Sequence, residues 1–117
     1  MLKNKLPQEL CIDLLPRSIC NVAVAAVIVD SNGRVSSWAW NHCGEDGLGE
    51  CAERAAVKRC NPRRLAGSDI YIAGWWHHSK NWVAAIPCSR CMAVLKKRGI
   101  RRIYHTRKDG SWAAIVM

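Results

Sequence analysis

Two short stretches of this sequence contain residues that together could bind a metal ion and move protons. The first, CAER, places Cys51, Glu53 and Arg54 at the start of a segment rich in helix-forming residues. The second, PCSRC, spaces Cys88 and Cys91 three positions apart, so both thiols lie on one face of a helical turn and can chelate one ion. Three thiolates would leave the fourth tetrahedral position to water, which is the arrangement of catalytic rather than structural zinc.

Glu53 and Arg54 give such a metal site a specific chemistry. Zinc polarises water toward hydroxide, and a carboxylate beside the ion can take the proton, pass it to a ring nitrogen and later protonate departing ammonia. These steps amount to hydrolytic deamination of an amidine-like ring carbon. Arg54 can donate to a thiolate and offset the negative charge of three sulfurs on one ion. The alternative for Arg54 is an ordinary position on the helix surface.

The main alternative for the three cysteines is a closed structural zinc site, with Cys43 or Cys60 as the fourth ligand. Such a site would need no Glu53 beside the metal. CxxC alone is also typical of a redox pair, but the tryptophan that often precedes such a pair is absent here. The remaining Cys11, Cys20 and Cys60 are expected to be small core or surface residues.

The elements that must position these residues alternate between helix and strand. We expect helices at residues 2–15, 50–60 and 87–99, and strands at residues 22–30, 35–41, 68–76, 100–107 and 112–117. This order predicts one α/β domain over residues 1–117, with a single sheet covered by helices. Both cysteine-bearing helices begin at the carboxyl edge of the sheet, where open α/β sheets place ligand sites.

Size, charge and hydropathy limit where the protein acts and on what. The longest apolar run, residues 22–29, is too short to cross a bilayer, and the N-terminus is a poor match to a secretory signal, so we expect a cytoplasmic protein without a membrane partner. Its seven cysteines are then expected to be thiols or metal ligands rather than disulfides. The net charge of +9 favours a polyanionic or phosphorylated partner. The alternative is that the charges form a solvated basic surface with no such partner.

From about residue 18 to the end, the chain resembles the small cytidine deaminases of the zinc-dependent cytidine and deoxycytidylate deaminase superfamily. CAER and PCSRC match the two zinc motifs of that family, VAVAAVIVDSNGRV is similar to its first hairpin, and YHTRKDGSW to its last two strands. The resemblance implies a three-layer α/β/α cytidine-deaminase-like fold, whose five-stranded mixed sheet ends in an antiparallel hairpin. It also implies a Zn²⁺ cofactor held by the three cysteines, and a homo-oligomer, dimer or tetramer, with active sites at subunit interfaces.

The resemblance further implies that Asn41, Glu45 and Ala52 contact the substrate. The family usually places an Asn and, two residues later, a Glu after the second strand to hold the ribose. Asn41 fits the first position, Cys43 occupies the second, and Glu45 is the candidate substitute. The aromatic residue that is usual near the first strand is missing, and Cys20 lies close to its place.

Three functions remain open from the sequence. The resemblance and the small size favour an enzyme that converts cytosine to uracil in a free nucleoside or nucleotide. Deamination of cytosine in single-stranded DNA or RNA is favoured by the charge, by the basic runs KRCNPRR and KKRGIRR, and by Trp75, Trp76 and Trp82, which could stack bases. Most of these tryptophans are instead expected to pack under their loop or in an oligomer interface. The third function is a non-catalytic, zinc-stabilised module that binds nucleic acid.

Overall fold

A computed structural model of the chain describes residues 5–44 and 49–117. Short helices and strands alternate along it, as the sequence predicts. In chain order they are α1 (Pro7–Leu14), the 3-10 turn η1 (Leu15–Arg17), β1 (Val22–Val29), β2 (Val35–Trp40), α2 (Ala52–Arg59), the 3-10 turn η3 (Pro62–Arg64), β3 (Asp69–Trp76), α3 (Ser89–Lys97), β4 (Arg102–Thr106) and β5 (Trp112–Val116).

The strands form one five-stranded mixed sheet in the order β2-β1-β3-β4-β5. Only β3 and β4 run parallel, with α3 in the crossover between them, and the other neighbouring pairs are antiparallel. The last two strands form the expected antiparallel hairpin, with Ile103 paired to Ile115. The predicted sheet is therefore confirmed.

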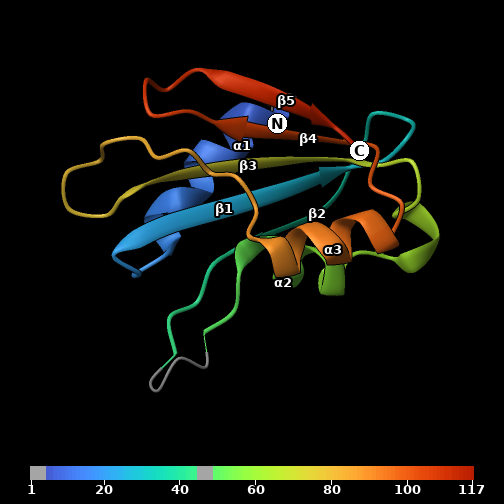
Figure 1. Cartoon of the computed structure of the whole chain (residues 1–117), viewed down its shortest axis with the longest axis horizontal. Coiled ribbons are helices and arrows are strands. Elements are labelled where there is room, and N and C mark those ends of the chain that lie inside the picture. The colour runs from blue at the N-terminus through green and yellow to red at the C-terminus, as the bar shows by residue number, and fades with distance from the viewer. Residues whose placement is uncertain (1–4, 45–48) are drawn as a thin grey trace.

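The helices lie in two layers, one on each face of the sheet (Figure 1). Successive side chains of a strand point to opposite faces, and β1 shows this pattern. Ala26 and Ile28 join the core under α2 and α3, whereas Ala25 and Val27 join the core under α1. This arrangement confirms the three-layer α/β/α fold. No helix in the described part of the chain is long and apolar enough to span a bilayer.

The helices begin later than the sequence suggests. Helix α1 starts at Pro7, a residue that fits the first turn of a helix but not its interior, and the start of the expected 2–15 helix lies outside the described residues. Helix α2 starts at Ala52 and α3 at Ser89, because Cys51 and Cys88 have extended backbones and cap the two helices. The two cysteines therefore stand at the points where the chain turns into each helix.

Candidate active site

Three cysteine thiols come together where α2 and α3 begin, and the two helices lie beside each other on one face of the sheet (Figure 1). The Sγ atoms of Cys51, Cys88 and Cys91 all lie within 4.8 Å of one another. Cys51 and Cys88 cap the two helices, and Cys91 lies in the first turn of α3, as its three-residue spacing predicts. The structure thus brings the three cysteines into one cluster.

The sulfur cluster fits a zinc ion. A tetrahedral zinc with bonds of about 2.3 Å to sulfur holds its thiolates roughly 3.8 Å apart, which is compatible with the observed spacing. The backbone N–H of Cys91 lowers the pKa of the Cys88 thiol, while burial raises the pKa of the Cys91 thiol. No fourth Cys, His, Asp or Glu among residues 5–44 and 49–117 joins the cluster. A metal held here keeps a coordination position that these residues do not fill.

The candidate fourth ligands of a closed zinc site lie elsewhere. Cys43 forms a disulfide with Cys20, with 5.5 Å between their Cα atoms, and Cys60 is buried with its Sγ 3.4 Å from the Ser36 hydroxyl. The expectation that no cysteines form disulfides is therefore wrong for this pair. The two residues are 23 positions apart, and the adjacent ends of β1 and β2 bring them together.

Glu53 lines a pocket beside the thiols. The pocket has a volume of about 200 Å³ and is lined by Val22, Val24, Asn41, Cys51, Ala52, Glu53, residues 83–86 and Cys88. Glu53 is 6% exposed, and this burial raises the pKa of its carboxyl group. Asn41 and Ala52, both expected at the site, also line the pocket, whereas Glu45 lies outside the described residues.

Arg54 reaches the cluster of thiols from the first turn of α2, the turn that also carries Glu53. Its Nη2 atom donates to the Sγ atom of Cys51 at 3.7 Å. This hydrogen bond is the largest cause that raises the pKa of Arg54, and the nearby Cys91 thiol adds to it. A guanidinium in this position can offset the negative charge that three thiolates place around one divalent ion.

Residues 83–86 form a pocket wall that sequence reasoning missed. Thr106 holds this segment at the end of β4: its hydroxyl donates to the carbonyl of Val83 at 3.0 Å, and its own carbonyl accepts from the N–H of Ala85 at 3.0 Å. The wall also packs tightly on β3, since a Cβ atom added to Gly74 would lie 2.8 Å from the Val83 side chain. The run VAAI just before the PCSRC motif was the available signal.

The tryptophan loop mostly packs against the protein. The rings of Trp75 and Trp82 lie 5.4 Å apart and cover the core on the α1 side of the sheet. Trp76 differs, because it is 51% exposed. Of the two expected alternatives, packing under the loop or in an oligomer interface, the first describes Trp75 and Trp82.

Comparison with known proteins identifies the family. A family model described as the cytidine and deoxycytidylate deaminase zinc-binding region matches residues 5–106, which include all three clustered cysteines and Glu53. The chain belongs to the cytidine and deoxycytidylate deaminase family. Comparison with curated protein sequences gives no match.

Solved structures of cytidine deaminases share the fold of this family member. The cytidine deaminase from Burkholderia pseudomallei superposes with a TM-score of 0.72 at 21% identity, covering 94% of this chain and 89% of that one. The enzyme from Mycobacterium leprae gives 0.61 at 18% identity, covering 92% and 88%. The enzyme from Mycobacterium tuberculosis gives 0.55 at 20% identity, covering 88% and 86%. The zinc cofactor follows from the family together with the cysteine cluster.

Proposed function

We propose that this protein is a zinc-dependent hydrolase that converts cytosine to uracil in a free nucleoside or nucleotide. The observation that carries the proposal is a cluster of three thiols, two of which line a small pocket together with one buried carboxylate. Cys51, Cys88 and Cys91 would hold the metal, and Glu53 would move protons. When bound, Zn²⁺ supplies a Lewis acid that lowers the pKa of a water molecule.

The burial of Glu53 in the pocket supports a role in proton transfer. Its carboxylate would accept a proton from the attacking water and deliver it to the ring nitrogen beside the reacting carbon. It would then take the remaining proton of the added hydroxyl group and pass it to the amino group, which leaves as ammonia, so that water and cytosine become uracil and ammonia. A carboxyl group whose pKa is raised by burial holds a proton more readily, which suits this shuttling role.

Two groups in the pocket can orient a base. The backbone N–H of Ala52 is the first of α2 and has no partner within the helix, so it can donate to a carbonyl oxygen of the ring. Asn41 lines the same pocket from the end of β2. The apolar side chains of Val22 and Val24 can contact the faces of the ring.

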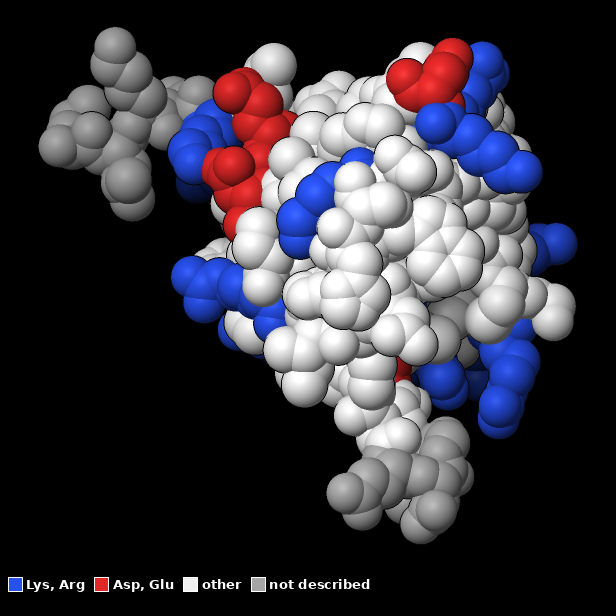
Figure 2. Space-filling view, turned by 90° about the vertical axis from the view of Figure 1, so that its left-hand side faces the viewer, with Lys and Arg blue, Asp and Glu red and all other residues white. Residues whose placement is uncertain are grey.

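The size and surroundings of the pocket favour a small substrate. A volume of about 200 Å³ is below the usual range for drug-sized ligands, so a base would fill it and a sugar would sit toward its mouth. Figure 2 shows the side of the molecule at which β1 begins and β3 ends, with uncharged side chains over most of its centre and Lys and Arg mainly around its margin. This distribution suits a small ligand better than a long polyanion.

Deamination of a polynucleotide is the second candidate, because the chain carries a net charge of +9 and Trp76 exposes half of its surface.

A homo-oligomer is also part of the proposal. Large apolar side chains such as Ile19 and Ile86 are 83% and 54% exposed, and contact between copies would cover them.

The test offers the zinc-loaded protein cytidine, deoxycytidine, their monophosphates and a cytosine-containing single strand in parallel. We expect uracil products from one or more of the free nucleosides or nucleotides, and none from protein stripped of metal with a chelator. Conversion of the strand alone, weakening as salt increases, would favour the second candidate. Stoichiometric zinc without turnover of any of these substrates would contradict the enzymatic proposal.

A further inference from the structure

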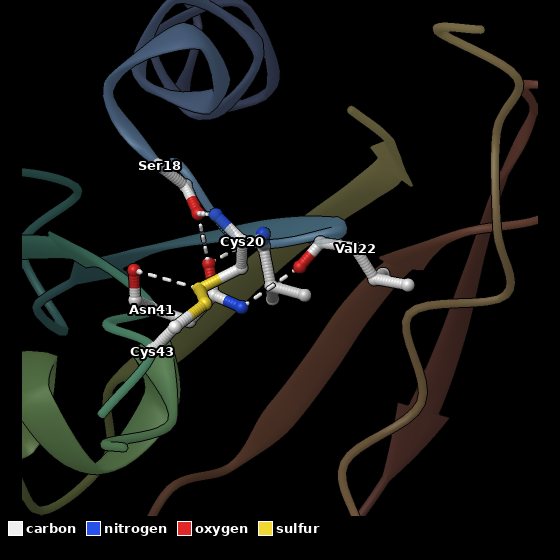
Figure 3. Close-up of a disulfide and its surroundings, with 6 residues drawn as sticks. Ser18, Cys20, Val22, Asn41 and Cys43 are labelled. Carbon is white, nitrogen blue, oxygen red and sulfur yellow. Dashed lines mark hydrogen bonds between the residues drawn. A yellow bond between two sulfur atoms is a disulfide. The ribbon is translucent and has the colours of Figure 1, made fainter. Parts of the chain in front are cut away.

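A disulfide joins Cys20 to Cys43 (Figure 3). It joins the segment that enters β1 to the segment that leaves β2, and the 5.5 Å between the Cα atoms is normal for a disulfide. Val22 and Asn41, each two residues from one of these cysteines, both line the pocket. The disulfide therefore links two parts of the pocket wall.

Hydrogen bonds fix the Asn41 side chain on this wall (Figure 3). Its Oδ1 atom accepts from the hydroxyl of Ser18 at 2.6 Å and from the N–H of Val24 at 3.0 Å. Its Nδ2 atom donates to the carbonyl of Val22 at 2.9 Å. Both lone pairs of the oxygen are then used, and one amide hydrogen remains for a ligand. The backbone partners also settle which end of the amide is which.

Ser18, Cys20, Cys43 and Asn41 form a closed ring. Ser18 lies two residues before Cys20, and Asn41 lies two residues before Cys43. The disulfide closes one side of this ring, and the hydrogen bond from Ser18 to Asn41 closes the other. Ser18 is 1% exposed, so water does not compete freely for its hydroxyl group. Opening the disulfide removes the covalent link and leaves the two segments joined by hydrogen bonds alone, those of Asn41 with Ser18, Val22 and Val24.

We propose that Ser18 and the Cys20–Cys43 disulfide position Asn41 for substrate binding, so that the affinity of the pocket depends on the redox state of this disulfide. The substrate half of this inference rests on the proposed deaminase function. Asn41 would give its free amide hydrogen to an oxygen of the sugar or base. Neither Ser18 nor the disulfide would take part in the chemical step.

The disulfide is open to reduction from one side. Cys43 is exposed, whereas Cys20 is buried, so a thiolate of a dithiol can attack the Cys43 sulfur and release the Cys20 thiolate. The second thiolate of the dithiol then attacks the mixed disulfide and releases Cys43. Two electrons and two protons pass to the protein, and the dithiol becomes a disulfide. In a reducing compartment this reaction would loosen Asn41, and under oxidising conditions the reverse would fix it.

The test measures KM and kcat of the zinc-loaded protein before and after reduction with a phosphine, which breaks the disulfide while its phosphorus takes an oxygen atom from water. We expect KM to rise by roughly tenfold, the loss of about one hydrogen bond, with kcat within about twofold and the zinc retained. The variant Cys43→Ser should have the raised KM with or without phosphine. In the oxidised protein, Ser18→Ala should raise KM while the disulfide stays intact.

Cys60→Ser is the matched control, because it removes a buried free thiol and leaves the disulfide in place. It should respond to phosphine as the wild type does. The inference is overturned if all seven cysteines are alkylated without reductant, or if reduction leaves KM unchanged or lowers it. A joint loss of zinc and kcat on reduction would also overturn it, since the disulfide would then support the metal site rather than Asn41.

A second measurement keeps this inference separate from the proposed function. Hydrogen–deuterium exchange in peptides covering residues 18–24 and 41–44 should become faster on reduction, whether or not any cytosine substrate is turned over. Absence of turnover in both redox states would contradict the deaminase proposal. Unchanged exchange in both peptides would contradict the positioning role of the disulfide.

Discussion

Two adjacent residues of one helix turn, Glu53 and Arg54, have opposite charges and different places beside the clustered thiols. They are neighbours in the first turn of α2, two and three residues after the cap Cys51, yet they face different environments. Glu53 is buried in the lining of the pocket, and burial outweighs the nearby positive charge of Arg54 in setting its pKa. Arg54 directs its guanidinium to the sulfur of Cys51. The carboxylate is thus left free to act on a ligand while the arginine compensates the thiolates.

Replacement of this arginine tests its role as a counter-charge. We expect Arg54→Gln to keep the zinc, because all three thiols remain, but to lower kcat about 10- to 100-fold, since three uncompensated thiolates make the ion a weaker Lewis acid. Zinc content and kcat would be measured on the same preparation. Arg59→Gln is the matched control, because Arg59 lies exposed in the same helix, over the ring of Trp38. Equal activity in the two variants would contradict the role of Arg54.

Two kinds of element build the pocket, and they differ in how they are held. The helix starts that carry the cysteines are fixed by the cores beneath α2 and α3. The wall at residues 83–86 belongs to no helix or strand and depends on Thr106 and on the close approach to Gly74. The shape of the pocket is therefore sensitive to changes on β3 that do not touch the metal ligands.

Substitution of Gly74 should move this wall. The new methyl group of Gly74→Ala would meet Val83 at 2.8 Å, a contact that requires the segment to shift. We expect a loss of about 1–3 kcal/mol in the free energy of unfolding and an increase in KM, with zinc retained.

The control for this change is Gly33→Ala, at the turn between β1 and β2. Gly33 has φ of 81° and open space around its Cα, so alanine there costs about 1–2 kcal/mol of backbone strain far from the pocket. Denaturant unfolding and steady-state kinetics would compare the two variants. An equal increase of KM in both variants would contradict the role of the 83–86 wall, because general destabilisation would then explain the effect.

The fold of the whole molecule could be predicted from the sequence, because the apolar pattern of each helix and strand is visible within its own stretch of residues. The run at 22–29 alternates between two cores, and the five predicted strands and three helices are all present. The zinc cluster was also accessible, since CAER and PCSRC place chemically distinctive residues at helix starts. The Cys20–Cys43 disulfide and the 83–86 wall were not. They depend on which segments lie side by side in three dimensions: the apolar run VAAI was a signal for the wall, but the sequence does not record what it packs against.

The stability of the whole domain should depend on pH through Asp30. The Asp30 carboxylate accepts from the N–H of Arg34 at 2.9 Å, the main cause that lowers its pKa, and from Nε of Arg64 at 3.0 Å. A pKa lower in the folded than in the unfolded state stabilises the fold above the unfolded value of about 3.9, and this contribution is lost as the pH falls through the folded value. Chemical unfolding from about pH 6 to pH 2 should therefore show a smaller decline for Asp30→Asn than for the wild type. Parallel profiles would contradict this assignment.

The central claim is that Glu53 moves protons at a zinc site built from three cysteines. The most direct measurement compares the wild type and Glu53→Gln in parallel. It determines the zinc content of each protein and the ammonia that each releases from cytidine, deoxycytidine and their monophosphates. We predict one zinc per chain in both proteins, with ammonia released by the wild type and a loss of at least about 100-fold in the variant. Loss of zinc in Glu53→Gln, or ammonia release equal to that of the wild type, would contradict the account.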